Sequence, residues 1–221
     1  MAVISLGYVV IEAQDLGSWQ DFACNIAGLM AAPSPNDDVA LFRMDDRPYR
    51  LWVEKGAADR FVRQAGNARI ARRSNRCWKG SRRQAARWNA RRHGSAWPSV
   101  YELARSSDPA GNPMELFYGR FVDYAPFTSP AGVSRFVTGS PHGADGDMGM
   151  GHVVLTAPNF EETHAFYKSV MGFGDTDLGR FYLMGGGPDD PGIGFAFLHC
   201  NPRPTAWRWG SCPKAPMARC T

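Results

Sequence analysis

The sequence has few cysteines and no long apolar run, and these two absences exclude several classes of protein. The five cysteines among the 221 residues are an odd number without a C-x-x-C pair, so we expect reduced thiols rather than a disulfide framework or a zinc knuckle. No apolar run approaches the roughly 18 residues of a membrane span, and the N-terminus lacks the basic region of a secretory signal. We therefore expect a folded cytoplasmic protein without a membrane partner.

Acidic residues are missing from one segment of the chain. Residues 60–92 contain twelve lysines and arginines and no aspartate or glutamate, whereas the whole chain has 25 basic and 21 acidic residues. Arginines with Trp78 and Trp88 among them are typical of a nucleic-acid-binding stripe, in which cations contact phosphates and aromatic rings stack on bases. A solvated helix face is the alternative, although the segment lacks the apolar period of 3.6 that docks a helix. A third explanation, given below, leads us to expect no nucleic-acid partner.

The sequence contains a repeat at a constant offset of 144 residues. Residues 7–16 (GYVVIEAQDL) align with residues 151–160 (GHVVLTAPNF), and at the same offset Gly28 falls on Gly172. Each of these glycines follows a stretch with apolar residues at three- and four-residue spacing, which is the pattern of an amphipathic helix that ends at a glycine. The chain is therefore predicted to contain two copies of one module.

Both copies predict the same order of elements. An apolar run rich in β-branched residues predicts a strand, and Asp15 or Asn159 then predicts a helix N-cap. Short strands are predicted at residues 39–44, 50–53, 114–118, 181–184 and 194–198. The fold class is therefore α+β, with two tandem βαβββ modules of which the second is incomplete. We place the modules at residues 1–123 and 147–221, joined by a Pro-, Ser- and Gly-rich linker at residues 124–146.

Several motifs resemble a known family. The turn D-P-x-G-N-P and the strand M-E-L-F-Y-G that follows it resemble the vicinal oxygen chelate superfamily, whose paired modules form a cupped sheet around a metal. Three further segments are similar to type I extradiol dioxygenases that act on dihydroxybiphenyl-like catechols: G-Y-V-V-I at residues 7–11, G-M-G-H-V-V-L at 149–155 and F-L-H-C-N-P-R at 197–203. The resemblance covers residues 1–60 and 99–203.

This resemblance implies extradiol cleavage of a catechol by O2 in aromatic-compound catabolism, in a homo-oligomer. The family holds a non-haem Fe(II) with two histidines and one carboxylate, in the second module only, and His152 matches the first of these ligands. Its counterpart in the first copy is Tyr8, so the first module should hold no iron. Glu115 corresponds to the carboxylate ligand, and we expect it to form a hydrogen bond inside the first cup instead.

The other two ligands have no match in this sequence. The working carboxylate would fall 144 residues after Glu115, past Thr221, and no histidine follows His199. His199 lies near the position of the family's acid/base histidine, so it either packs in the sheet or lines the pocket, and no catalytic residue is assigned. We therefore expect a chain that lacks two iron ligands and is inactive as given.

Residues 63–98 and 204–221 depart from the family in composition. Both are rich in the Arg, Ala, Gly, Pro and Trp that a shifted reading frame produces in a GC-rich gene. We hypothesise that both segments were translated out of frame, and we expect residues 63–98 to be poorly packed. Two alternatives remain for the function: a metal-free module of the same superfamily that uses its cup as an apolar pocket, and a nucleic-acid binder that uses the Arg-rich segment.

Overall fold

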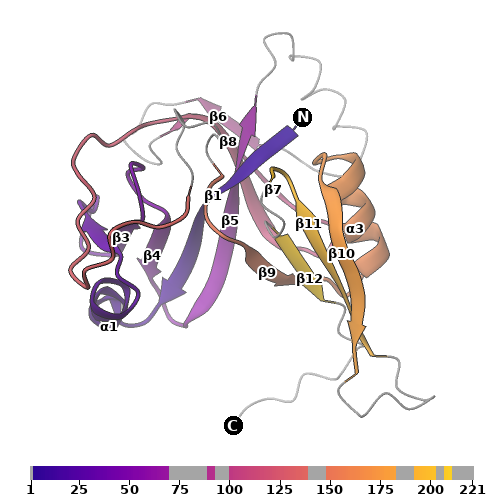
Figure 1. Cartoon of the computed structure of the whole chain (residues 1–221), viewed down its shortest axis with the longest axis horizontal. Helices are drawn as coiled ribbons and strands as arrows, with labels where there is room; N and C mark the ends of the chain where they lie inside the picture. The colour runs from indigo at the N-terminus through magenta and orange to yellow at the C-terminus, as the bar shows by residue number, and fades with distance from the viewer. Residues whose placement is uncertain are drawn as a thin grey trace.

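The computed structural model describes residues 2–69, 89–92, 100–138, 148–182, 192–202 and 207–210, of which residues 2, 69, 89–92 and 207–210 are described by their backbone alone. Their strands form an eight-stranded sheet, ordered β2-β3-β4-β1-β5-β8-β7-β6, and a four-stranded sheet, ordered β10-β11-β12-β9. In Figure 1 the four-stranded sheet and α3 lie on the right, and α1 lies at the lower left.

The eight-stranded sheet consists of two halves with the same pairing. In the first half β1 is parallel to β4, which is antiparallel to β3, which is antiparallel to β2. In the second half β5, β8, β7 and β6 repeat this pattern, and β1 and β5 join the halves as antiparallel neighbours. We call these halves the first and second units. Their elements are β1 (Ala2–Ala13), α1 (Leu16–Asp21), the π-helix η1 (Phe22–Ile26), β2 (Met30–Ala32), β3 (Val39–Arg43), β4 (Leu51–Lys55), β5 (Arg60–Arg69), β6 (Asn89–Arg92), β7 (Val100–Ser107) and β8 (Pro113–Arg120).

The four-stranded sheet repeats the pairing once more. In this third unit β9 is parallel to β12, and β12, β11 and β10 follow as antiparallel neighbours. The α+β class with tandem modules is therefore as predicted, and the pairing adds that the predicted first module contains two four-stranded units. Its elements are β9 (Val153–Thr156), α3 (Phe160–Ser169), β10 (Gly174–Phe181), β11 (Ile193–His199) and β12 (Trp207–Gly210).

The 144-residue repeat is visible in the backbone. Gly28 and Gly172 both have positive φ angles, +73° and +78°, which only glycine adopts at little cost. The same hydrogen bond spans each of them, from the N–H of Leu29 to the C=O of Ala23 at 2.8 Å and from the N–H of Phe173 to the C=O of Tyr167 at 3.0 Å. The two helices therefore end in the same way, at equivalent residues.

The two predicted N-caps behave differently. The Asp15 carboxylate accepts hydrogen bonds from the N–H groups of Gly17 and Ser18, at 2.8 and 3.2 Å, and is a cap as predicted. Asn159 occupies the N-cap position of α3, but its side chain accepts no backbone N–H. Its amide donates instead to the Pro109 carbonyl at 2.9 Å, so this side chain connects α3 to the turn between β7 and β8.

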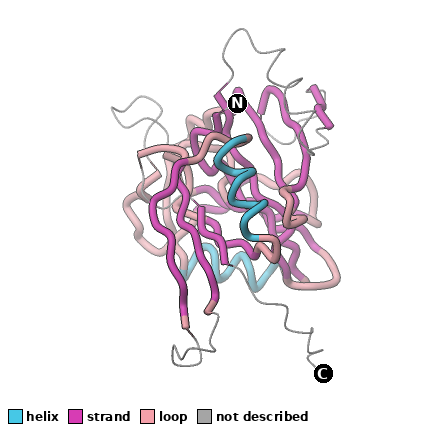
Figure 2. Tube along the Cα trace, turned by 90° about the vertical axis from the view of Figure 1, so that its right-hand side faces the viewer, coloured by secondary structure: helices cyan, strands magenta, loops and turns pink. Residues whose placement is uncertain are grey.

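Helix α3 packs against both sheets, and Figure 2 shows it in front of the strands. Tyr167 is fully buried among apolar residues from β1, β8, β9 and β11. Its hydroxyl accepts a hydrogen bond from Gln64 Nε2 at 3.1 Å and donates one to Asp108 Oδ2 at 3.2 Å. Burial of such a ring stabilises the fold by roughly 1.5–3 kcal/mol. Among the described residues, neither α-helix has the length and apolar character to cross a membrane.

Two sequence predictions are corrected. Residues 63–69 are not poorly packed, because they belong to β5, where residues 64–68 are buried between β1 and β8. The strand predicted at residues 181–184 instead runs from Gly174 to Phe181, directly after the glycine that ends the helix.

Residues 207–210 pair with β11 and β9. Trp78, Trp88 and the rest of residues 70–88 and 93–99 lie outside the described residues, as do 203–206 and 211–221.

Candidate functional site

The first and second units enclose an apolar cup between them. Side chains from β1, β3, β5, β7 and β8 and from the loops beside them meet there in one buried cluster. We call this the first cup, and its buried residues are Tyr8, Val10, Leu41, Tyr49, Ala65, Val100, Leu103 and Phe117.

Tyr8 and Glu115 meet inside the first cup, although they are 107 residues apart. Tyr8 on β1 pairs in register with Ala65 on β5, which pairs in register with Glu115 on β8. The Tyr8 hydroxyl donates a hydrogen bond to Glu115 Oε2. The prediction that Glu115 forms a hydrogen bond in this cup is confirmed. Burial, followed by the neighbouring Glu115 charge, raises the pKa of Tyr8 well above its ordinary value.

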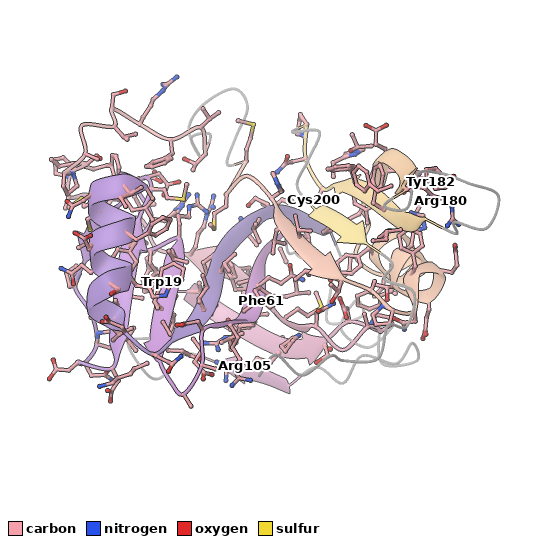
Figure 3. The ribbon with its side chains drawn as sticks, turned by 90° about the horizontal axis from the view of Figure 1, so that it is seen from below. Trp19, Phe61, Arg105, Arg180, Tyr182 and Cys200 are labelled. Carbon is pink, nitrogen blue, oxygen red and sulfur yellow. The ribbon has the colours of Figure 1, made fainter. Side chains whose placement is uncertain are left out.

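Two arginines balance the buried carboxylate of Glu115. Arg105 Nε donates to Glu115 Oε1 at 2.7 Å, and Arg63 Nε lies 3.0 Å from the same oxygen as an ion pair without hydrogen-bond geometry. Arg105 lies toward the surface, at the lower edge of Figure 3, whereas Arg63 is largely buried and also lies 3.4 Å from Glu54 Oε1. Both oxygens of Glu115 are thus engaged by protein groups.

Sequence reasoning missed Arg63, because it placed this residue in a segment translated out of frame. Its place in the fold comes from long-range pairing, because Arg63 on β5 aligns with Val10 on β1. Residues 61–68 read F-V-R-Q-A-G-N-A, a length typical of a strand, and they lie before the part of the segment in which arginines dominate.

His152 lies one residue before β9, and its side chain is exposed. It lies at the edge of the exposed face of the third unit. Val154 on β9 and Phe197 on β11 both align with Arg208 on β12, so they lie on one face of the sheet. Side chains two residues apart on a strand point to the same face, so Phe195 and His199 lie on this face as well. We call this the open face, and it comprises Val154, Phe181, Phe195, Phe197 and His199.

His199 makes a packing contact within the open face. Its Nδ1 lies 2.8 Å from the hydroxyl of Thr176 in a hydrogen bond. Its ring covers Gly174, where a Cβ atom would come within 2.8 Å of the imidazole. These contacts fit the packing role that the sequence left open, and a role in lining a pocket stays a prediction.

Two hollows lie among the residues that the structure describes. One of about 20 Å³ lies beside Tyr8 and Phe117, which is room for a single water molecule. A larger hollow of about 710 Å³ lies between Arg43 and Phe136, in the segment that follows β8. The first cup is therefore too well filled for a drug-sized ligand, which needs about 300–1,000 Å³.

Comparison with known proteins identifies the family. The family model described as dihydroxybiphenyl dioxygenase BphC D1 matches residues 6–56. The 3-methylcatechol 2,3-dioxygenase of Pseudomonas putida strain F1 is 33% identical over 217 residues, which cover 96% of this chain and 70% of that protein. The chain belongs to the extradiol dioxygenases. The family that the motifs indicated is thus confirmed.

Other extradiol dioxygenases give the same result. The iron-dependent extradiol dioxygenase of Rhodococcus jostii RHA1 is 31% identical over 215 residues, which cover 92% of this chain and 66% of that protein. The crystal structure of BphC, a halotolerant catechol dioxygenase, superposes with a TM-score of 0.80 at 26% identity, covering 95% of this chain and 65% of that one. The chain thus spans about two thirds of the length of these relatives.

The described part of this extradiol dioxygenase does not by itself fit an iron site. A site of the family type needs two imidazoles and a carboxylate on one face. Among the described residues there is no group of three His, Cys, Asp or Glu side chains able to hold a metal. Glu115 is engaged by Tyr8 and two arginines, and lies in the first cup rather than beside His152.

Proposed function

We propose that this chain acts in the extradiol cleavage of a catechol-type aromatic compound by O2, with Fe(II) as the metal and His152 as one of three iron ligands. The observation that carries the proposal is the pair Tyr8 and Glu115 in the first cup. His152 is the counterpart of Tyr8 in the 144-residue repeat. A histidine at this position would face a carboxylate on a neighbouring unit, as Tyr8 faces Glu115.

The register of the first cup indicates where the other two ligands belong. Tyr8, Ala65 and Glu115 lie side by side on β1, β5 and β8, so two of these three positions are on the second unit. Their counterparts beside His152 would lie on a fourth unit, which the described residues do not contain. One imidazole alone binds a divalent ion weakly, so we expect the 221-residue chain to carry well under one iron and to show no ring cleavage.

The open face supports an aromatic substrate. Phe181 and Phe195 stack with ring centroids 4.4 Å apart, and Phe195 and Phe197 meet edge to face at 5.4 Å. Planar rings of this kind pack against a catechol ring through the same offset and edge contacts. A cytoplasmic location and a homo-oligomeric assembly complete the proposal, and both agree with the expected reduced thiols and with the family resemblance.

The proposal is tested with a chimera. Residues 1–202 of this chain are joined to the corresponding C-terminal part of the Pseudomonas putida relative, which supplies closing strands. Iron per chain and the yellow ring-opened product of 3-methylcatechol are measured for the chimera and for the 221-residue chain. We expect iron and product only from the chimera.

The matched variants of the chimera are His152→Ala and His164→Ala. His164 is a partly buried histidine of α3 that contacts Asp175 at 2.6 Å, so its loss should leave iron and activity in place. Loss of His152 should abolish both. A chimera that keeps its iron and activity without His152, or a 221-residue chain with one iron per chain, contradicts the proposal.

A further inference from the structure

Three arginines line the small hollow beside Tyr8 in the first cup. Arg47 and Arg50 come from the loop between β3 and β4, and Arg120 is the last residue of β8. The other lining residues are glycine, proline, valine and aromatic residues. The wall of this hollow therefore contains three cations and no carboxylate.

Hydrogen bonds hold two of these guanidinium groups at the wall of the hollow. Arg50 Nη1 donates to the Gly7 carbonyl at 2.9 Å, and Arg47 Nη1 donates to the Phe121 carbonyl at 3.3 Å. Gly7 and Phe121 line the same hollow. Arg47 and Arg50 are 4% and 1% exposed, so solvent ions screen their charges only weakly.

Carboxylates beside two of the arginines do not cancel the positive charge that acts on the third. Asp45 Oδ2 lies 2.6 Å from Arg50 Nη2, and Asp46 Oδ1 lies 3.7 Å from Arg47 Nε. Burial, followed by the charges of Arg47 and Arg50, nevertheless lowers the pKa of Arg120 to about 9. Arginine keeps its proton in proteins, so a bound negative charge is the way to offset this field.

The volume of the hollow limits the size of the anion. It encloses about 20 Å³, which is room for one particle of about the size of a water molecule. Sulfate, phosphate and carboxylate groups consist of several heavy atoms and are too large, whereas a halide ion is a single atom. Each guanidinium group offers several N–H donors in one plane, which suits a spherical acceptor approached from three sides.

We propose that this hollow binds a chloride ion between Arg47 and Arg50 of the first unit and Arg120 of the second unit. The ion offsets the repulsion among the three guanidinium groups, and it links the loop before β4 to the end of β8. No residue of the third unit takes part. The site is therefore independent of iron binding and ring cleavage, and it goes beyond the proposed function.

Urea denaturation of the 221-residue chain tests the site, with chloride exchanged for gluconate at constant ionic strength. Gluconate is too large for the hollow, so only chloride can fill it. A rise in chloride from about 1 mM to about 100 mM should increase the ratio of folded to unfolded chain about tenfold, which is the effect of a ligand with a dissociation constant of about 10 mM.

Two variants remove the site in different ways. Arg120→Met deletes one cation, and Val100→Ile adds a methylene group to the wall of the hollow while all three arginines stay. Both variants should lose the response to chloride. The control is Arg135→Met, because Arg135 is an exposed arginine outside this hollow, and it should keep the tenfold response.

Crystals grown in bromide locate the ion directly, because the anomalous scattering of bromine marks its position. We expect a bromide among the three guanidinium groups. If Arg120→Met fails to fold by circular dichroism, Val100→Ile alone decides the comparison. A wild-type stability that does not change with chloride, a response that survives in a folded Arg120→Met or Val100→Ile variant, or a bromide that binds only elsewhere would overturn the proposal.

Discussion

Three substitutions at or beside the buried carboxylate of Glu115 should lower the free energy of unfolding by different amounts, because the side chains differ in burial. Tyr8→Phe removes one hydroxyl and keeps the ring, which stacks on Phe117 with centroids 5.4 Å apart. A hydrogen bond to a charged group contributes about 1.5–3 kcal/mol. Tyr8 and Glu115 are 2% and 1% exposed, so bulk water does not reach the carboxylate to replace the lost donor. We expect Tyr8→Phe to lower the free energy of unfolding by about 2 kcal/mol.

The other changes at this carboxylate should give clearly different values. The Arg105 side chain is 52% exposed, so solvent screens its ion pair and Arg105→Met should cost less than about 1 kcal/mol. Glu115→Gln leaves the buried Arg63 without its main counter-charge and should cost about 3–5 kcal/mol. That loss is a large share of the 5–15 kcal/mol of a typical domain.

Urea denaturation followed by circular dichroism measures all three variants, with stability taken from the midpoint and a common slope. The expected order of destabilisation is Glu115→Gln, then Tyr8→Phe, then Arg105→Met. An Arg105→Met variant as unstable as Tyr8→Phe would refute the ranking by burial. A neutral Glu115→Gln would refute the claim that the carboxylate compensates Arg63.

Three further predictions concern other parts of the fold. Tyr167→Phe should cost about 1–3 kcal/mol in urea denaturation, because buried partners lose a hydroxyl. Gly111 has a φ angle of +89° and no atom near an added Cβ, so Gly111→Ala should lower the free energy of unfolding by about 1–2 kcal/mol. Gly28→Ala should cost more, because its Cβ would also lie 2.4 Å from a Val133 side-chain atom. Equal losses in the two variants would contradict this prediction. Burial raises the pKa of Tyr8 and of Tyr167. The unfolded chain therefore loses phenolic protons above about pH 10 that the folded chain keeps, and the free energy of unfolding should fall as the pH rises past that value. The fall should be less steep in Tyr8→Phe, which has one buried phenol fewer.

Local signals account for what the sequence predicted well. The strand, capped helix and glycine that open each copy depend on residues close together in the chain, and Gly28 and Gly172 have the positive φ angles that this pattern requires. The hydrogen bond of Glu115 inside the first cup was predicted because the family resemblance matches this residue to a ligand position, whereas its partner Tyr8, 107 residues away, is found only in the structure. Asn159 shows the limit of the local argument, because its amide finds a partner at Pro109.

The second unit was not predicted as a unit because β5 does not look like a buried strand. Arg60 and Arg63 lie in its first four positions, and it contains Gln64 and Asn67, which are buried. These side chains are stabilised by distant partners, Gln64 by Tyr167 at 3.1 Å and Asn67 by Ser5 at 3.3 Å. Hydrogen bonds of this kind offset the cost of burying an amide, but the sequence does not reveal them before the fold is known.

The first cup shows how a carboxylate buried in this fold is compensated by protein groups alone. A carboxylate buried at the Glu115 position needs a compensating positive charge. In the first cup Arg63 and Arg105 supply it, and Tyr8 adds a neutral donor. An imidazole in place of the phenol binds a metal through its nitrogen lone pair, so a bound cation then provides both the charge and the link between the two side chains. We therefore expect His152, rather than the strand order that all three units share, to distinguish the third unit as the metal-binding one.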